Sequence, residues 1–304
     1  MSIVLTRLKS QKASHLRGLA ALAMVVLATA VSSCQPSRPR AETIPFRLQD
    51  GCVIIPATLN GTPVHAFIDT GQPGILIDSK DQRQLGLVSV QSNHVVRTPH
   101  GGKFNLSILN APIKVGVGDV SLTVPNAAVV NLNRHNRPGL TPQDVALGSY
   151  FFDSNVVTID YGKRSLTFRP NSGDVLVCPP GNVYDGHFDF FSEGNRTPIV
   201  PLTIDGYLGR MLIDTEVPSN VFVETPGVST FHLNAEASDA AHHPQRKAVI
   251  HSILIGSLAL PQTVEFEDLP YPDNVDGRIG SEGFIKNRLS LTFDYASQRL
   301  CITR

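Results

Sequence analysis

Two aspartates stand at matching places in two similar stretches of the sequence. Asp69 ends the apolar run 66–68, Asp214 ends the apolar run 211–213, and a threonine follows each of them. Two carboxylates about 3 Å apart cannot both ionise comfortably, so such a pair shares one proton. The pair then supplies a base that activates water and an acid that protonates a leaving group. Asp69 and Asp214 are therefore the candidate acid–base pair, and hydrolysis is the chemistry that suits them.

An internal repeat must bring these aspartates together. Residues 54–71 and 199–216 align without gaps at an offset of 145 positions. Asn60-Gly61 and Asp205-Gly206 lie between apolar runs, which predicts tight hairpin turns because these residue types tolerate positive φ. Each unit is expected to begin as strand, turn and strand, with the second strand ending in Asp-Thr. One carboxylate then comes from each unit.

The two units also share an ending. Ala146-Leu147-Gly148 precedes alternating apolar runs at 157–161 and 165–168, and Gly277-Arg278-Ile279-Gly280 precedes similar runs at 291–295 and 299–302. Such alternation is typical of strands with one buried face. The chain of 304 residues, with 24 glycines and 22 prolines, is long enough for two lobes with cores. These features predict an all-β fold of two similar lobes.

The run Ala66 to Gly71 resembles the signature loop of aspartic proteases, in both the pepsin-like and the retropepsin-like families. The resemblance covers essentially the whole chain after the first 33 residues and is closest to bacterial retropepsin-like proteins fused in tandem. It implies an all-β, bilobal aspartic-protease (acid protease) fold from two tandem retropepsin-like units. It also implies an aspartic endopeptidase with Asp69 and Asp214 as catalytic residues, with no cofactor and no metal. The substrate implied is a peptide or protein bound in extended form.

The same resemblance assigns supporting roles. Thr70 and Thr215 are expected to brace the two catalytic loops by hydrogen bonds across a pseudo-two-fold axis, and Gly71 to let the backbone pass close to substrate. A flap is expected from Val96 to Phe104. Its turn is formed by His100, Gly101 and Gly102.

Glu216 departs from this pattern, because the family has glycine at that position. A side chain there is strained if the backbone needs positive φ, and its carboxylate adds negative charge beside the pair. A catalytically degenerate peptide-binding or envelope-interaction lipoprotein is therefore the alternative function. A third possibility pairs the first unit between two chains; a monomer is favoured, because the second unit would have to be displaced.

The first 33 residues predict a lipoprotein signal peptide. Four basic residues and no acid precede the apolar run 19–31, which is shorter than the roughly 20 residues of a spanning helix. The run ends in Val31-Ser32-Ser33-Cys34, which resembles a bacterial lipobox with Cys34 as the lipidated residue. An ordinary signal peptide, or an uncleaved anchor, with an incidental cysteine is the alternative. Gln35 after the cysteine is not the aspartate associated with inner-membrane retention. In a bacterium with two membranes, the expected location is therefore the outer membrane, facing the periplasm.

Domain limits, partners and cysteines complete the prediction. The expected segments are the signal peptide 1–33, a tether 34–42, a first lobe 43–170, a linker 171–195 and a second lobe 196–304.

Basic and acidic residues number 26 each, which gives no electrostatic reason to expect nucleic acid. No zinc-binding sequence pattern is present. Cys52, Cys178 and Cys301 allow one disulfide with one thiol left over, or free buried thiols, and the sequence leaves the pairing open.

Overall fold

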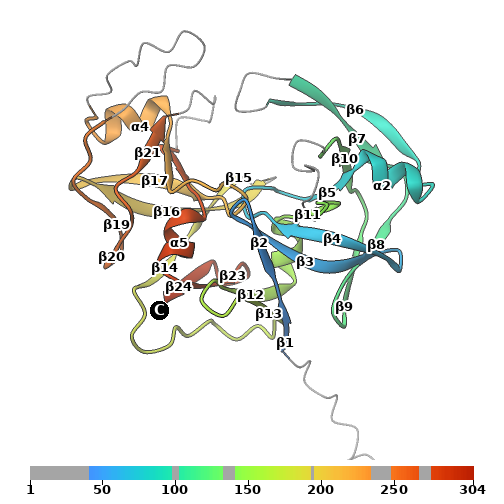
Figure 1. Cartoon of the computed structure of the whole chain (residues 1–304), viewed down its shortest axis with the longest axis horizontal. Coiled ribbons are helices and arrows are strands. Elements are labelled where there is room, and N and C mark those ends of the chain that lie inside the picture. Colours follow the sequence, from blue (N-terminus) through green and yellow to red (C-terminus); the bar gives the residue numbers. More distant parts are fainter. Residues whose placement is uncertain (1–40, 98–102, 133–140, 193–194, 234–247, 267–274) are drawn as a thin grey trace, which may run out of the picture. The chain divides into compact units, whose positions relative to one another are not determined.

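The computed structural model describes residues 41–97, 103–132, 141–192, 195–233, 248–266 and 275–304. Most of these residues lie in strands that form three sheets, with short helices at strand ends (Figure 1). The predicted all-β fold class is confirmed. Over the described ranges, no helix is both long and apolar enough to cross a membrane.

The first sheet contains ten strands from the first half of the chain. Its order is β6-β7-β10-β5-β11-β4-β3-β8-β9, and β2 pairs with β3. The strands are β2 (Arg47–Gln49), β3 (Cys52–Leu59), β4 (Thr62–Ile68), β5 (Ile75–Asp78), β6 (Ser89–Arg97), β7 (Lys103–Leu109), β8 (Ile113–Val117), β9 (Val120–Val124), β10 (Ala128–Val130) and β11 (Val145–Leu147). Helices α2 (Ser79–Gln84) and α3 (Ser149–Asp153) follow β5 and β11.

The second sheet contains eight strands from the second half. Its order is β20-β19-β16-β17-β22-β18-β21, and β15 pairs with β16. The strands are β15 (Asp189–Ser192), β16 (Asn195–Ile204), β17 (Tyr207–Ile213), β18 (Val221–Val223), β19 (Ile253–Ile255), β20 (Leu258–Ala259), β21 (Val264–Phe266) and β22 (Gly277–Ile279). Helices α4 (Thr225–Thr230) and α5 (Glu282–Lys286) follow β18 and β22.

The two sheets repeat the same local design. The hairpins β3–β4 and β16–β17 have the same register, since Ile54 faces Phe67 and Ile199 faces Leu212. Both turns take positive φ at both central residues, with φ of 50° and 84° at Asn60-Gly61 and of 47° and 90° at Asp205-Gly206. The tight turns predicted from these dipeptides are confirmed. The second strand of each hairpin ends at the residue before the aspartate, at Ile68 and at Ile213.

A six-stranded sheet joins the two halves. Its order is β1-β13-β12-β23-β24-β14, so the central contact pairs a strand of each half. The strands are β1 (Glu42–Pro45), β12 (Asn155–Asp160), β13 (Ser165–Pro170), β14 (Tyr184–His187), β23 (Ser290–Asp294) and β24 (Arg299–Thr303). Thr158 and Thr292 face each other across this contact, with hydroxyl oxygens 2.8 Å apart. Buried aromatic rings of α3 and β23 pack near it, with the centroids of Phe152 and Phe293 at 5.6 Å.

The segment 171–195 contains more regular structure than a simple tether. It holds β14, which pairs with β24, and β15, which pairs with β16. Polar and turn-forming residues predict a linker here, but the strands are too short to show alternation over several residues. Strand β14 is stabilised by pairing with the last strand of the chain, and β15 by pairing with the strand that follows it.

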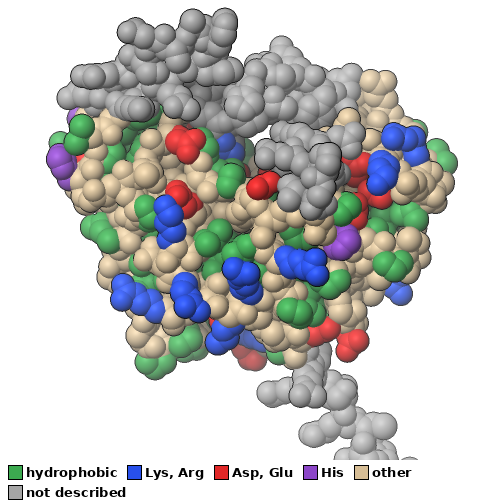
Figure 2. All heavy atoms as spheres, in the orientation of Figure 1, with side chains coloured by type: hydrophobic (Ala, Val, Ile, Leu, Met, Phe, Trp, Pro, Cys, Tyr) green, Lys and Arg blue, Asp and Glu red, His purple; other side chains and the backbone are tan. Residues whose placement is uncertain are grey.

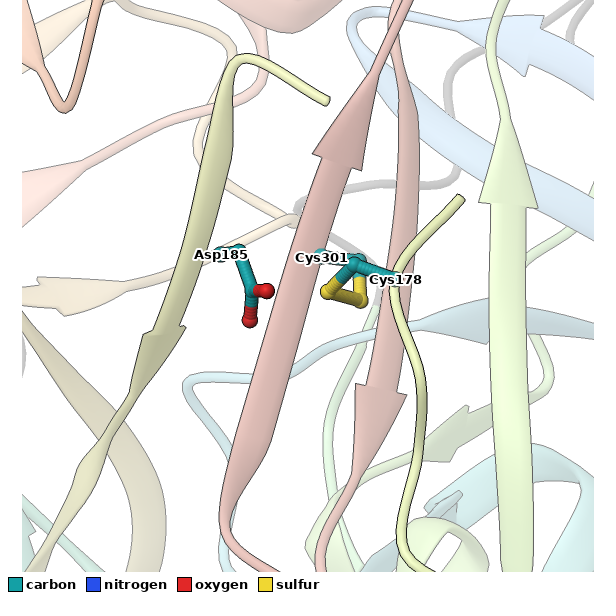
Figure 3. A group of neighbouring side chains, drawn as sticks. All are labelled: Cys178, Asp185 and Cys301. Carbon is teal, nitrogen blue, oxygen red and sulfur yellow. A yellow bond between two sulfur atoms is a disulfide. The ribbon is translucent and has the colours of Figure 1, made fainter. Parts of the chain in front are cut away.

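Two cysteines at opposite ends of the second half are bonded. Cys178 and Cys301 form a disulfide across 123 positions, with Cα atoms 5.5 Å apart. Figure 3 shows Cys301 on a strand next to the one that carries Asp185, with Cys178 approaching from the other side. Cys52 is a free, buried thiol. The structure thus settles the pairing that the sequence leaves open.

Removing this disulfide should destabilise the chain. A bridge across so long a loop restricts the unfolded chain strongly, so the Cys178→Ser/Cys301→Ser variant should lose about 2–4 kcal/mol of unfolding free energy. Urea denaturation of the two proteins measures the loss. Reductant should lower the midpoint of the wild type towards that of the variant and leave the variant unchanged. Equal midpoints for the two oxidised proteins would contradict the expectation.

Candidate active site

Each candidate aspartate is held by a strand that runs parallel to its own hairpin. Strand β11 pairs with β4, and the Asp69 amide donates to the Leu147 carbonyl at 3.1 Å. Strand β22 pairs with β17 in the same way, and the Asp214 amide donates to the Ile279 carbonyl at 2.9 Å. The ending shared by the two units therefore fixes the position of each aspartate at a strand end.

Asp69 and Asp214 meet in a buried place. Only 5% of Asp69 and 7% of Asp214 is exposed. One carboxylate oxygen each of Asp69, Asp214 and Glu216 lie within 4.8 Å of one another. In each loop, Oδ1 of the aspartate accepts a hydrogen bond from the amide two residues later, at 2.9 Å from Gly71 and 3.3 Å from Glu216. The repeat therefore brings together the two residues that the sequence singles out.

Thr70 and Thr215 connect the two aspartate loops. Each amide donates to the hydroxyl oxygen of the other threonine at 3.1 Å. The Thr70 hydroxyl donates to the Ile213 carbonyl at 2.7 Å, and the Thr215 hydroxyl donates to the Ile68 carbonyl at 3.1 Å. Both threonines are completely buried. The loops are thus joined by reciprocal hydrogen bonds that are shielded from water.

A second reciprocal contact lies beside the threonines, and sequence reasoning missed it. The Thr197 hydroxyl donates to the Gly71 carbonyl at 3.2 Å, and the Cys52 thiol donates to the Glu216 carbonyl at 3.3 Å. Residues 52 and 197 are separated by the same offset as the two aspartates, so each half holds the third residue of the opposite loop. The repeated register was the available signal, but the two side chains differ and obscure it.

Gly71 and Glu216 occupy equivalent positions with different surroundings. A Cβ at position 71 would lie 2.6 Å from Cγ of Asp214, so only glycine fits there without displacing that carboxylate. The space next to Gly71 is thus occupied by its partner aspartate. Glu216 is not among the described residues with positive φ. The backbone strain considered for a side chain at position 216 therefore does not arise.

The environment of Asp69 favours its protonated form. Burial raises the pKa of Asp69 well above its usual value, and the nearby carboxylates of Glu216 and Asp214 raise it further. The Gly71 amide and the Arg278 guanidinium oppose this increase only in part. The charge effect expected from Glu216 is therefore present at the site.

Arg278 is the main site residue that sequence reasoning missed. Its Nη1 lies 3.1 Å from Oδ2 of Asp214, and the two side chains are only 8% and 9% exposed. Arginine is rarely buried without an acidic partner. A charged residue in the expected buried strand of Gly277-Arg278-Ile279 was the signal that could have identified this pair.

The acidic group also has the oxygen ligands that Mg²⁺ and Ca²⁺ prefer. Arg278, however, already supplies positive charge to Asp214 at this place. Cys178, Asp185 and Cys301 form another close group, but its two sulfur atoms are bonded to each other. On the face shown in Figure 2, acidic, basic and hydrophobic side chains of the described residues are interspersed.

Two predicted features lie outside the described residues. The arms of the expected flap pair as β6 and β7, with Arg97 facing Lys103, but His100, Gly101 and Gly102 are not described. Cys34 and the signal peptide are also outside the described ranges. The flap and the lipid anchor stay predictions.

Comparison with known proteins gives a family match and a similar solved structure. Residues 55–151 match the aspartyl protease family. The match contains Asp69, Thr70 and Gly71 and runs from β3 into α3, and it supports a protease-like function. The two sheets that each present an Asp-Thr loop form the all-β, bilobal aspartic-protease fold. No curated protein matches the chain. The crystal structure of basic 7S globulin from soybean is similar with a TM-score of 0.48 and 10% identity, over 87% of this chain and 95% of that chain.

Breaking the threonine contact should loosen the aspartic-protease fold at its centre. The Thr70→Val variant keeps the side-chain shape but leaves the Ile213 carbonyl and the Thr215 amide without this hydroxyl. Buried groups that lose a partner should reduce the unfolding free energy by about 2–4 kcal/mol. Thermal or urea denaturation measures this.

Thr43→Val is the matched control for this change. Thr43 is exposed, and its hydroxyl lies 2.8 Å from that of Thr167. Its replacement should change stability by no more than about 0.5 kcal/mol. Equal losses of unfolding free energy in the two variants would show that the contact between the loops contributes no more to stability than an exposed hydrogen bond does.

Proposed function

We propose that this protein is an aspartic endopeptidase in which Asp69 and Asp214 share one proton and activate water. The observation that best supports the proposal is the convergence of the two buried carboxylates, one from each half, within 4.8 Å. The aspartyl protease match over residues 55–151 supports the same reaction class. Thr70 and Thr215 are proposed to keep the two loops in register during the reaction.

The arrangement provides both proton transfers that peptide hydrolysis needs. The ionised carboxylate takes a proton from water as the water oxygen bonds to the peptide carbonyl carbon, and the protonated carboxylic acid donates to the carbonyl oxygen. The resulting tetrahedral species loses its amine after a proton passes to the nitrogen. Because the pKa of Asp69 is raised, the singly protonated pair persists towards neutral pH, and activity is expected on the acidic side of neutral.

The proposal includes the form of the substrate and the location of the enzyme. A peptide or protein segment is proposed to bind in extended form beneath the hairpin of β6 and β7, with His100, Gly101 and Gly102 at its turn. The lipobox-like sequence before Cys34 supports a lipid-anchored protein of the bacterial cell envelope, on the outer membrane and facing the periplasm. The protein is proposed to act as a monomer, because one chain supplies both aspartates.

Replacing one aspartate tests the reaction directly. Asp69→Asn keeps the shape and removes the titrating group, so kcat/KM on an unfolded protein substrate should fall at least about 100-fold. Asp119→Asn, which changes an exposed aspartate in the β8–β9 turn, is the control and should retain full activity. A statine-type inhibitor should block the wild type. Undiminished cleavage by Asp69→Asn would end the proposal.

A catalytically degenerate peptide-binding or envelope-interaction lipoprotein is the second candidate, and Glu216 favours it. This residue adds a third carboxylate where a retropepsin-like site has glycine. Under this alternative, the protein binds extended peptides saturably but does not cleave them.

Glu216→Gly separates the two candidates. In an active peptidase the change should retain cleavage and lower the upper pH limit of activity, because the pKa of Asp69 falls when the neighbouring negative charge is removed. Peptide cleavage measured across a pH series provides the result. A silent wild type that gains cleavage through this change would instead support a binding protein disabled at Glu216.

A further inference from the structure

Arg278 occupies a position that faces the aspartate pair. It lies on β22 between Leu212 of β17 and Phe222 of β18, which are its direct neighbours in register. Residues opposite each other in a sheet project to the same face, and alternate residues of one strand do so as well. Leu212 precedes Asp214 by two positions. Arg278 and Asp214 therefore project to the same face of the second sheet.

The contact between the two side chains is specific to one oxygen. Nη1 of Arg278 lies 3.1 Å from Oδ2 of Asp214, while Oδ1 accepts the Glu216 amide. The Arg278 guanidinium carbon also lies 5.2 Å from the centroid of the Phe222 ring. Both oxygens of Asp214 thus accept hydrogen bonds, and one bond comes from a buried cation.

Among the residues that the structure describes, no charged side chain of the first half occupies the position equivalent to Arg278. Ala146 occupies the matching position on β11, between Phe67 and Leu76 in the same register. Its methyl group cannot donate a hydrogen bond, so residue 146 gives Asp69 no counterpart of the Arg278 contact. The two aspartates occupy equivalent places in the fold but differ in their electrostatic surroundings.

Arg278 and Glu216 are two charged departures of the second half that lie beside Asp214. Glu216 stands where the first half has Gly71, and Arg278 stands where it has Ala146. Their charges are opposite, and both lie next to Asp214. If Glu216 is ionised and the aspartate pair holds one proton, the three acids carry a charge of −2, and Arg278 brings the net charge of the group to −1. The arginine thereby compensates for the glutamate.

We propose that Arg278 is a positioning residue that fixes the charge of the pair, holding Asp214 as the carboxylate that accepts the proton of water and leaving the shared proton on Asp69. This inference rests on the proposed endopeptidase function and assigns a separate role to each aspartate. Among the described residues, other titratable groups at the pair are Glu216, the thiol of Cys52 and the phenol of Tyr295. Burial raises the pKa of Cys52 and of Tyr295, so both stay neutral.

The dependence of kcat/KM on pH tests the charge role. Arg278→Met keeps much of the side-chain length and removes the charge, so both pH limits of activity should move upwards by about one unit. Arg278→Lys, which retains the charge, should restore most of the profile. Glu216→Gln should move both limits downwards. The double variant Arg278→Met/Glu216→Gln should return close to the wild type, because the two shifts oppose each other.

A structural role alone predicts different behaviour. Arg278→Met would then lower the rate at every pH without moving the limits, Arg278→Lys would not restore the profile, and the double variant would be worse than either single one. Any of these results overturns the proposal. The double variant is informative because it gives the second half a neutral pair of residues, as in the first half.

A second measurement does not depend on cleavage. Carbon-13 NMR of the aspartate carboxyl groups, assigned with Asp69→Asn and Asp214→Asn, reports which of the two is ionised. Asp214 should show the ionised signal at a pH where Asp69 still shows the protonated one, and Arg278→Met should remove this order. The opposite order in the wild type contradicts the inference. The expected order in a protein that cleaves nothing would retain the charge assignment and reject the endopeptidase.

Discussion

The reciprocal hydrogen bonds between Thr70 and Thr215 are the constraint on which the site depends. They join loops that are far apart in the sequence, and each hydroxyl contacts backbone groups of the opposite loop. Because both threonines are fully buried, separating the loops would leave several polar groups without partners or water. This contact can hold the two acidic groups close together, where their mutual repulsion on ionisation would otherwise move them apart.

Two features of the site offset its excess negative charge. On Asp69, burial and neighbouring acids favour a bound proton; on Asp214, a buried guanidinium provides an opposite charge. A symmetrical fold therefore carries an unsymmetrical distribution of charge. The difference comes from residues 216 and 278, which lie on separate elements of the second half and converge on the same carboxylate.

The sequence predicts those features that depend on local chemistry or on the repeat. The turns at Asn60-Gly61 and Asp205-Gly206 are predictable because positive φ is a property of the residues themselves. The fold class follows from alternating runs and from the repeated Asp-Thr ends. The Cys178–Cys301 pairing and the Arg278 contact were not predictable, because both depend on how distant strands pair. The backbone conformation at Glu216 likewise needs coordinates.

The six-stranded sheet has a consequence for the integrity of the molecule. Strand β12 of the first half and β23 of the second are neighbours there, and the disulfide links Cys178 to the last strand, β24. A peptide-bond break between Cys178 and β16 would therefore not release either fragment. The pieces would remain covalently attached and aligned through a shared sheet, so a nicked molecule could keep both aspartates in one particle.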